Sequence, residues 1–252
     1  MTTWVLLRGL TREARHWGDF PHLLRATLDS GLAPESIVTP DLPGNGRRHA
    51  EASPIQVEAM LEACRADLRE QGRAPPYHLL AMSLGAMVAV AWTLRYPEEC
   101  RAAVLLNTSL RPHNPFTQRL RPRAWPALPR LLFAQGLARE RAILDLTSAQ
   151  PEKLRGVLPR WVEYGRDCPV SRRNTLRQLL AAARFFALGK PVVPLLILAG
   201  GGDRMVDPRC SLRLARAWSA DYAQHPSAGH DLALDAGEWV AERVRAWSAS
   251  LG

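Results

Sequence analysis

The sequence predicts an α/β protein with a mostly parallel sheet of about six strands, helices flanking the sheet, and a helical insertion in the second half of the chain. Short apolar runs alternate with longer segments of helical periodicity, which is the pattern of buried parallel strands joined by helices. Such an alternation builds a sheet that is covered on both faces. The expected strands are residues 3–7, 36–39, 77–82, 102–106, 192–199 and 220–224.

The alternation is interrupted in the middle of the chain. Helical patterns separated by prolines cover residues 125–137, 139–149 and 171–188. We interpret this stretch as a helical cap inserted into the α/β core. The expected division is therefore a core of residues 1–110 and 190–252 and a cap of residues 111–189.

Length and composition agree with one compact enzyme-sized domain. A chain of 252 residues with 47% apolar side chains can bury a full core. The first residues enter a strand without the basic region, apolar run and cleavage site of a secretory signal. No apolar stretch approaches the length of a bilayer span. We therefore expect a cytoplasmic protein.

The cysteines do not form a recognisable metal or redox motif. Cys64, Cys100, Cys168 and Cys210 lie far apart in the chain. Zinc knuckles and redox pairs place two cysteines within a few residues of each other. We therefore expect the four cysteines to be free thiols in a reducing compartment, and we expect no metal and no organic cofactor.

Residues 77–91 contain the most informative local pattern. An apolar strand runs through Ala81-Met82-Ser83-Leu84-Gly85 into an alanine-rich helix. Small residues two before and two after a serine let a strand-to-helix turn close tightly, and the helix directs its positive end at the serine. Serine and glycine also occur together in ordinary turns. Ser83 is nevertheless the predicted nucleophile, because other motifs accompany it.

Four further motifs accompany the serine turn. They are Leu7-Arg8-Gly9-Leu10 and Asp41-Leu42-Pro43-Gly44-Asn45-Gly46 upstream, GGGDRMV at residues 200–206, and Ala228-Gly229-His230-Asp231 near the end. Serine, then aspartate, then histidine is the chain order of one particular fold. On these motifs the sequence resembles the α/β-hydrolase fold family over nearly its whole length, with a variable middle. The resemblance implies that the insertion lies above the carboxyl ends of the strands, where it would choose the substrate.

The resemblance implies a catalytic triad. His230 is expected to accept the proton of Ser83 during attack and to return it to the leaving group. Asp203 is expected to hold the second ring nitrogen of the histidine. Asp207 is the competing acid in the same loop, but an aspartate followed by Pro208 is more typical of a helix cap.

Two backbone N–H groups are expected to stabilise the developing oxyanion. The N–H of Leu84 follows from the turn geometry, and by resemblance the second belongs to Leu10, after Gly9. The family usually has histidine at the position of Arg8. An arginine there would either favour an anionic substrate or pair with a nearby carboxylate, and the sequence leaves both alternatives open.

Several other polar or aromatic residues are candidates for the substrate pocket. His16 and Trp17 lie just beyond the oxyanion loop, while Asn107 and Ser109 end a strand at the same edge of the sheet. Ordinary packing or capping is the alternative for each of them. The turn at residues 41–46 is expected to be structural, because a lone Gly-x-Gly is a poor phosphate site.

The positive charge is concentrated in the insertion. The net charge is +9, and 16 of the 33 Lys and Arg residues but 5 of the 24 Asp and Glu residues lie between positions 111 and 190. A solvated helical surface is one explanation. An acidic carrier protein or a coenzyme A conjugate is another, since the short N-terminus and helical cap resemble carboxylesterases that demethylate acyl-carrier-bound methyl esters. The docking candidates are Arg119, Arg121, Arg123, Arg155 and Arg177.

The sequence thus predicts a serine hydrolase that cleaves an ester or thioester through an acyl-enzyme, with an apolar acyl group. A lyase or carbon–carbon bond hydrolase with the same triad, or a ligand-binding protein of this fold, is the alternative. Nucleic acid is a poor explanation for the charge, because no nucleic-acid-binding motif accompanies it.

Overall fold

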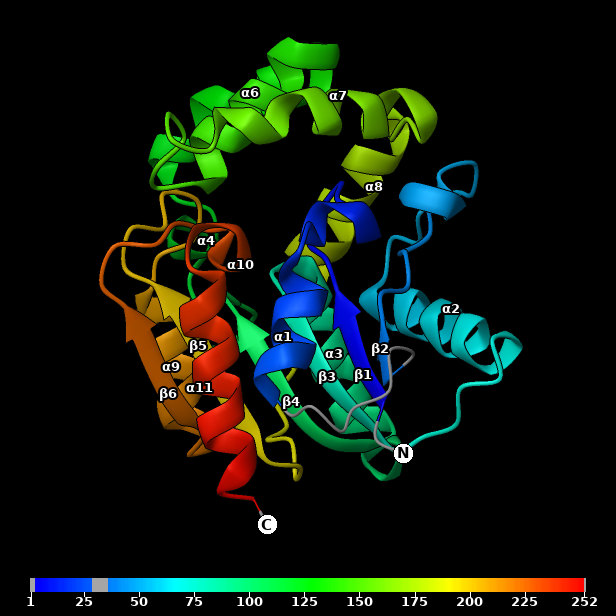
Figure 1. The fold of residues 1–252 in the computed structure, drawn as a ribbon, viewed down its shortest axis with the longest axis vertical. Coiled ribbons are helices and arrows are strands. Elements are labelled where there is room, and N and C mark those ends of the chain that lie inside the picture. Colours follow the sequence, from blue (N-terminus) through cyan, green and yellow to red (C-terminus); the bar gives the residue numbers. More distant parts are fainter. Residues whose placement is uncertain (1–2, 29–35, 252) are drawn as a thin grey trace.

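Six parallel strands form one sheet in the computed structural model, which describes residues 3–28 and 36–251 (Figure 1). The strands lie in the order β2-β1-β3-β4-β5-β6, and every neighbouring pair is parallel. Their bounds are β1 Thr3–Leu7, β2 Ile37–Val38, β3 Tyr77–Met82, β4 Cys100–Leu106, β5 Leu195–Gly200 and β6 Asp221–His225. The expected α/β fold with about six strands is confirmed.

The observed strands differ from the expected ones mainly at their ends. β5 begins at Leu195 and not at Val192, because Pro194 has no N–H to donate to a neighbouring strand. β2 is reduced to two residues at the edge of the sheet. β3 and β4, at the centre, reach their expected carboxyl ends at Met82 and Leu106.

Helices cover both faces of the sheet. Successive strand residues point to opposite faces, so Val5 and Leu7 contribute to one apolar cluster while Trp4 and Leu6 contribute to the other. α2, α3 and α9 pack on the first face, and α1 and α11 pack on the second. Their bounds are α1 Phe20–Leu28, α2 Val57–Glu70, α3 Leu84–Arg95, α9 Arg209–Trp218 and α11 Gly237–Ala249. Short elements in the connections are η1 Ala14–Trp17, η3 Gly46–Arg48, η4 Pro97–Glu99 and α10 Leu232–Asp235.

A series of short helices lies between β4 and β5; we refer to α4 through α8 as the inserted helices. In Figure 1, α6 and α7 arch over the carboxyl ends of the strands. A small apolar cluster containing Ile143, Leu144, Leu158 and Trp161 joins these two helices. The bounds are α4 Phe116–Arg119, η5 Pro122–Ala127, α5 Leu128–Phe133, α6 Gly136–Thr147, η6 Arg155–Val157, α7 Leu158–Asp167 and α8 Arg172–Arg184.

The inserted helices are shorter and more numerous than the sequence patterns indicated. The helix expected over residues 125–137 is divided into η5 and α5 and ends before Gly136, which has a positive φ of 53° and starts α6. The expected helices 139–149 and 171–188 correspond to α6 and α8. The sequence patterns did not single out α7. The boundaries of the expected cap, 111–189, stay a prediction.

Candidate active site

Ser83 joins β3 to α3 in a main-chain conformation that residues other than glycine rarely adopt, with φ 55° and ψ −115°. Such strain costs on the order of 1–3 kcal/mol and persists where the surroundings enforce it. A Cβ on Gly85 would lie 2.5 Å from the carbonyl oxygen of Leu7. Only glycine therefore lets α3 begin this close to the end of β1. The small residue two positions after the serine is a packing requirement.

The loop after β1 passes directly beside Ser83. A Cβ on Gly9 would lie 3.2 Å from the Cβ of Ser83. Leu10 follows Gly9 and lines the same pocket as Ser83. The next residue, Thr11, has a positive φ of 56°, and its N–H donates to Oε1 of Gln178 at 2.8 Å. The inserted helix α8 thus holds this loop in place.

Gln178 also connects the loop to the turn at residues 41–46. Its Nε2 donates to Oδ1 of Asn45 at 2.8 Å, and Nδ2 of Asn45 donates to the carbonyl oxygen of Arg12 at 3.0 Å. Asp41 accepts the N–H groups of Ala14 at 2.8 Å and Arg47 at 2.9 Å. These bonds give the turn a structural role. The sequence did not reveal Gln178, because a single glutamine in a helix carries no motif.

His230 and Asp203 form a buried pair. Nδ1 of His230 lies 2.7 Å from Oδ2 of Asp203, and the two side chains are 3% and 1% exposed. The other carboxylate oxygen accepts the N–H groups of Met205 at 2.7 Å and Val206 at 2.9 Å. Because an ionised carboxylate can only accept, the proton lies on Nδ1 and the lone pair of Nε2 is free to act as a base. His230 and Ser83 line one pocket, but among residues 3–28 and 36–251 no hydrogen bond joins their side chains.

The competing acid is engaged elsewhere. Asp207 accepts from the backbone N–H of Arg209 at 2.9 Å and pairs with the guanidinium of the same residue at 2.7 Å. Asp207 precedes Pro208, the N-cap residue of α9, and its carboxylate accepts the N–H of Arg209, the first residue of the helix. The pKa of Asp207 is lowered, mainly by the side-chain hydrogen bond from Arg209. Of the two aspartates, Asp203 contacts the ring of His230.

Asn107 fixes the position of the histidine loop. Its side chain accepts the N–H of Gly200 at 2.8 Å and donates to the carbonyl oxygens of Gly229 at 3.0 Å and His230 at 2.8 Å. Its φ of 46° turns the chain sharply after β4. The sequence suggested a pocket role for this residue; the structure instead places all its side-chain bonds on the main chain of β5 and the His230 loop.

Arg8 pairs with the residue next to the histidine. Its Nη1 and Nη2 donate to Oδ1 and Oδ2 of Asp231 at 3.1 and 2.6 Å, and each side chain is 3% exposed. The guanidinium also lies over the ring of Trp17, 4.7 Å from its centre. Burial opposes the charge of Asp231, but Arg8 outweighs it and lowers the pKa of that carboxyl. Of the two alternatives for Arg8, the pairing with a carboxylate is therefore observed.

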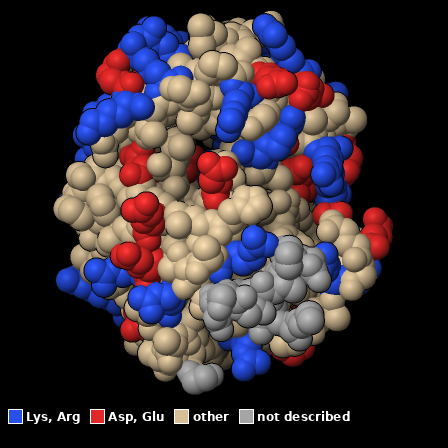
Figure 2. All heavy atoms as spheres, in the orientation of Figure 1, with Lys and Arg blue, Asp and Glu red and all other residues tan. Residues whose placement is uncertain are grey.

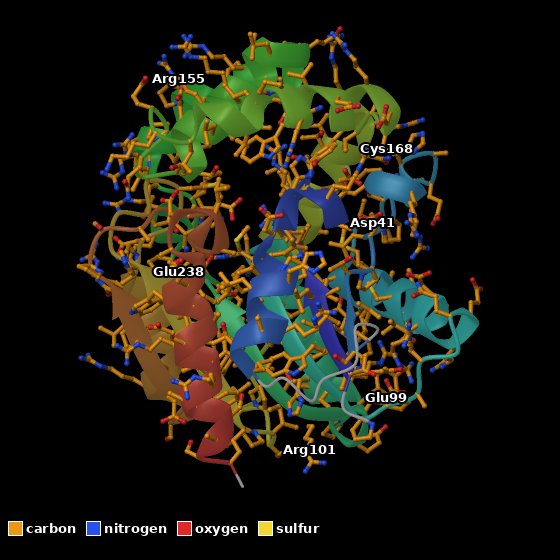
Figure 3. All side chains as sticks on the ribbon, in the orientation of Figure 1. Asp41, Glu99, Arg101, Arg155, Cys168 and Glu238 are labelled. Carbon is orange, nitrogen blue, oxygen red and sulfur yellow. The ribbon has the colours of Figure 1, made fainter. Side chains whose placement is uncertain are left out.

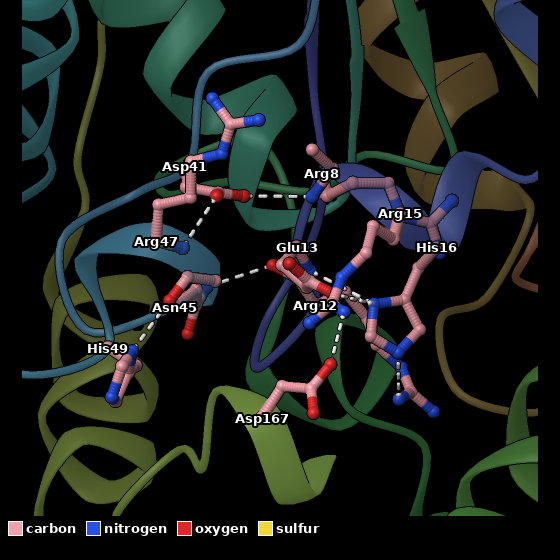
Figure 4. A network of polar contacts seen from close by, with 12 residues as sticks. Arg8, Arg12, Glu13, Arg15, His16, Asp41, Asn45, Arg47, His49 and Asp167 are labelled. Carbon is pink, nitrogen blue, oxygen red and sulfur yellow. Dashed lines mark hydrogen bonds and ion pairs between the residues drawn. The ribbon is translucent and has the colours of Figure 1, made fainter. Parts of the chain in front are cut away.

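Arg12, a second buried cation, links the loop after β1 to α6. Nη1 of Arg12 donates to Glu140 at 2.6 Å and lies 2.9 Å from Nε2 of His16 (Figure 4). Its guanidinium also lies 4.3 Å from the centre of the Trp161 ring. Burial and the charge of Arg12 lower the pKa of His16 well below its usual value, so His16 is neutral. His16 therefore serves the packing between the loop and the inserted helices.

One pocket contains Ser83, His230, Leu10 and Arg8. Its remaining wall comes from the loop after β1, from Met82, Met205 and Asp231, and from the inserted helices, which contribute three apolar and three polar side chains. The other candidates, His16, Trp17, Asn107 and Ser109, are buried and do not line it. The residues contributed by the inserted helices are Leu131, Arg139, Ile143, Leu146, Thr147 and Thr175.

All five arginines expected to dock a partner are bonded within the chain. Arg119 and Arg177 donate to main-chain carbonyls of residues 182–183 and of Ser53. Arg155 lies at the outer edge of the inserted helices and pairs with Glu152 (Figure 3). Basic and acidic side chains are interspersed over the face in Figure 2. The remaining two, Arg121 and Arg123, donate to the carbonyl oxygen of Asp203 at 2.9 and 3.0 Å.

In residues 3–28 and 36–251, no group of three or more His, Cys, Asp or Glu side chains is arranged to hold a metal ion. No helix there has the length and apolarity needed to cross a bilayer. The cysteines are free thiols, of which Cys64, Cys100 and Cys210 are buried and Cys168 is half-buried.

Comparisons with solved structures identify the same fold. A thermophilic esterase from Thermogutta terrifontis aligns with a TM-score of 0.75 and 20% identity, covering 100% of this chain and 90% of that one. 2-Hydroxy-6-oxo-6-phenylhexa-2,4-dienoate hydrolase from a Rhodococcus species aligns with a TM-score of 0.74 and 20% identity over 100% and 91% of the chains. An enol-lactonase from Burkholderia xenovorans aligns with a TM-score of 0.75 and 18% identity over 99% and 92%.

The sequence itself matches one family over most of its length. A comparison with curated proteins found no match. The model of the alpha/beta hydrolase family, however, matches residues 4–243, which include every motif discussed above. With the six-stranded parallel sheet and the serine turn already described, the conclusion is that this chain belongs to the alpha/beta hydrolase family.

Proposed function

We propose that this protein is a serine hydrolase that cleaves a carboxylic ester through an acyl-enzyme intermediate, with Ser83, His230 and Asp203 as its triad. The observation that carries the proposal is the buried 2.7 Å contact between Asp203 and His230, which in the neutral imidazole places the proton on Nδ1 and the lone pair on Nε2, in the pocket that Ser83 lines. A serine hydroxyl is a poor nucleophile at neutral pH without such a base.

In the first half of the reaction, Nε2 of His230 removes the proton of Ser83 as Oγ attacks the ester carbonyl. The resulting imidazolium is stabilised by Asp203, which stays ionised. The N–H groups of Leu84, at the start of α3, and Leu10, after Gly9, would donate to the oxygen that becomes negative. Donors of this kind lower the barrier by about 3–4 kcal/mol each. Collapse of the intermediate breaks the bond to the alcohol, which takes the proton from His230.

In the second half, His230 removes a proton from water, and the hydroxide attacks the acyl group on Ser83. The same two N–H groups receive the negative charge. Collapse then releases the carboxylic acid and returns the proton to the serine oxygen. We further propose that residues 111–189 act as the cap that selects the substrate, because the inserted helices contribute six side chains to the pocket wall.

The bonding of the cap arginines favours a small-molecule ester over an ester or thioester held by an acidic carrier protein or coenzyme A. Two of the three similar structures described above are named for an esterase and an enol-lactonase. The third is a dienoate hydrolase. One fold supports many reactions, so the alternatives are a carbon–carbon bond hydrolase, a lyase or a ligand-binding protein. Experiment must distinguish each of them from the proposed esterase.

The test is labelling with a fluorophosphonate, followed by location of the adduct by mass spectrometry. One adduct per chain on Ser83, together with turnover of p-nitrophenyl esters that depends on acyl length, is expected. Turnover without an adduct on Ser83 would contradict the assignment. Absence of both reactions in a folded protein would point to the lyase or ligand-binding alternative.

The activity should depend on the protonation of His230. Burial opposes the imidazolium and is the largest influence, but the charge and hydrogen bond of Asp203, with Asp231, outweigh it and raise the pKa of His230. Because the base must be neutral, kcat/KM is expected to rise with pH, with a midpoint above about 6.5. In Asp203→Asn the midpoint should fall. A midpoint that is unchanged in that variant would contradict the pairing.

Replacing Arg121 and Arg123 should lower kcat by the same factor for every substrate. Both donate to the carbonyl oxygen of Asp203, so their replacement by methionine loosens the loop that carries the acid. We expect the double variant to lower kcat on small p-nitrophenyl esters by about tenfold. Arg155→Met, on the outer edge, is the matched control and should leave kcat unchanged. A loss confined to carrier-bound esters would instead restore the docking hypothesis.

A further inference from the structure

A large cavity adjoins the pocket that contains Ser83. Its volume is about 620 Å³, and it is bordered by α5, α6, α7 and the start of α8 and is open to solvent, with Arg166 and Arg172 exposed. Leu131, Arg139 and Thr175 line both spaces, so the cavity lies directly beside the pocket. The catalytic pocket alone has a volume of about 50 Å³. A substrate longer than a short acyl group would therefore extend into the cavity.

The cavity has an excess of positive charge. Arg139, Arg166 and Arg172 line it, whereas the carboxylate of Glu140 in its wall already receives a hydrogen bond from Arg12 at 2.6 Å. Within the described ranges, none of the three arginine side chains makes a hydrogen bond or an ion pair, and the guanidinium of Arg172 lies over the ring of Phe133, 5.3 Å from its centre. Two helices of at least 12 residues, α6 and α8, also direct their amino-terminal ends here, since Gly136 and Arg172 line the cavity.

Among the described residues, Arg139 has no carboxylate partner, unlike the buried arginines Arg8 and Arg12. Arg8 and Arg12 are each paired with a carboxylate. Arg139 is half-buried, and its Nε is shielded from solvent without a hydrogen-bond partner. Burial is the main cause that lowers the pKa of this guanidinium, and the charge of Arg12 acts in the same direction against that of Glu140. A buried polar group without a partner is costly, and an anion would remove that cost.

We propose that this cavity binds an anionic group at the end of the acyl chain remote from the ester bond, and that Arg139 determines specificity for it. Leu131, Ile143 and Leu146 are the apolar side chains that the inserted helices contribute to the pocket that Arg139 also lines, so the connecting part of the chain is apolar. The substrate class is then an ester whose aliphatic acyl chain ends in a carboxylate or a phosphate. This inference rests on the proposed hydrolase function, and it names the substrate class of the same site.

The kinetic test compares matched pairs of p-nitrophenyl esters. The monoesters of adipic, suberic and sebacic acids end in a carboxylate, whereas those of hexanoic, octanoic and decanoic acids end in a methyl group. We expect kcat/KM to be about 10- to 100-fold higher for the carboxylate member of the best pair. This factor corresponds to the free energy of a hydrogen bond to a charged group. Arg139→Gln should remove most of this preference, chiefly through KM.

Arg141→Gln is the matched control, because Arg141 lies on the same helix, is exposed and lines neither space. It should retain the preference of the wild type. Arg172→Gln tests the same cavity if Arg139→Gln does not fold. We expect Arg139→Gln to fold with an unchanged or higher Tm, because an unpaired charge is removed from a partly buried position.

Binding measurements separate this inference from the catalytic proposal. Calorimetry on Ser83→Ala with adipate, suberate or inorganic phosphate should detect binding that Arg139→Gln weakens by at least tenfold. Binding of the dicarboxylates indicates a carboxylate end, and binding of inorganic phosphate alone indicates a phosphate end. Such binding without ester turnover in the wild type would refute the esterase and keep the anion site. Equal turnover of the matched esters, with no binding of any probe, would overturn the anion site and keep the esterase.

Discussion

Ser83→Ala is expected to lower kcat on p-nitrophenyl esters by about a million-fold, and Asp203→Asn in the same chain is expected to lower it no further. The residues of a triad act as one unit, so the second change removes a group whose task has already been lost. Asp203→Asn alone should lower kcat by about ten thousand-fold, because asparagine cannot accept from Nδ1 as the carboxylate does and no longer stabilises the imidazolium. The measurement is kcat for the two single variants and the double variant.

Asp207→Asn is the control for this series. The two aspartates lie in one loop, but Asp207 contacts Arg209 and not His230. We expect its replacement to change kcat by less than about threefold. A larger loss of kcat in Asp207→Asn than in Asp203→Asn would show that Asp207, and not Asp203, is the acid of the triad. Additive losses in the double variant would show that Ser83 and Asp203 act in separate steps.

Arg8→Met is expected to destabilise the protein by about 3–5 kcal/mol, because it leaves the carboxylate of Asp231 buried without its partner. The measurement is the free energy of unfolding by urea at neutral pH. The companion variant Arg8→Met/Asp231→Leu removes both charges and should recover much of the loss. A coupling free energy near zero in this double-mutant cycle would show that the pair does not stabilise the fold.

The same pair makes a pH-dependent contribution to stability. Since the pKa of Asp231 is lowered in the folded protein, its carboxylate stabilises the fold above the unfolded pKa of about 3.9. This contribution is lost as the pH falls through the folded value. The wild type should therefore lose stability more steeply in acid than Arg8→Met/Asp231→Leu. Parallel acid unfolding curves for the two proteins would contradict this expectation.

The strands and the motif positions were predictable because their signals are local. The four inner strands β1, β3, β4 and β5 are apolar and largely buried, which makes each of them recognisable in the sequence without its neighbours. The serine turn was predictable for a similar reason, since the contact of Gly85 with Leu7 demands a residue without a side chain at a fixed spacing. The choice of Asp203 over Asp207 also followed from a short motif together with the proline after Asp207.

The supporting contacts were not predictable, because they join residues far apart in the chain. Nothing local to Arg8 identifies Asp231, 223 positions later, as its partner. Gln178 and Asn107 are single amides whose partners lie in distant loops. The break between α5 and α6 falls at Gly136, whose positive φ the apolar periodicity does not reveal. Such choices are made by packing and not by periodicity.

The inserted helices hold the reactive loops as well as line the pocket. Glu140 on α6 bonds Arg12, Gln178 on α8 bonds the N–H of Thr11, and Arg121 bonds the carbonyl oxygen of Asp203. A chimaera that receives the insertion of a relative would lose all three connections while keeping Ser83, His230 and Asp203 intact. Under the proposed function, replacing the insertion would therefore change the support of the loops that carry the triad as well as the wall of the pocket. Any redesign of its specificity must retain those anchoring points.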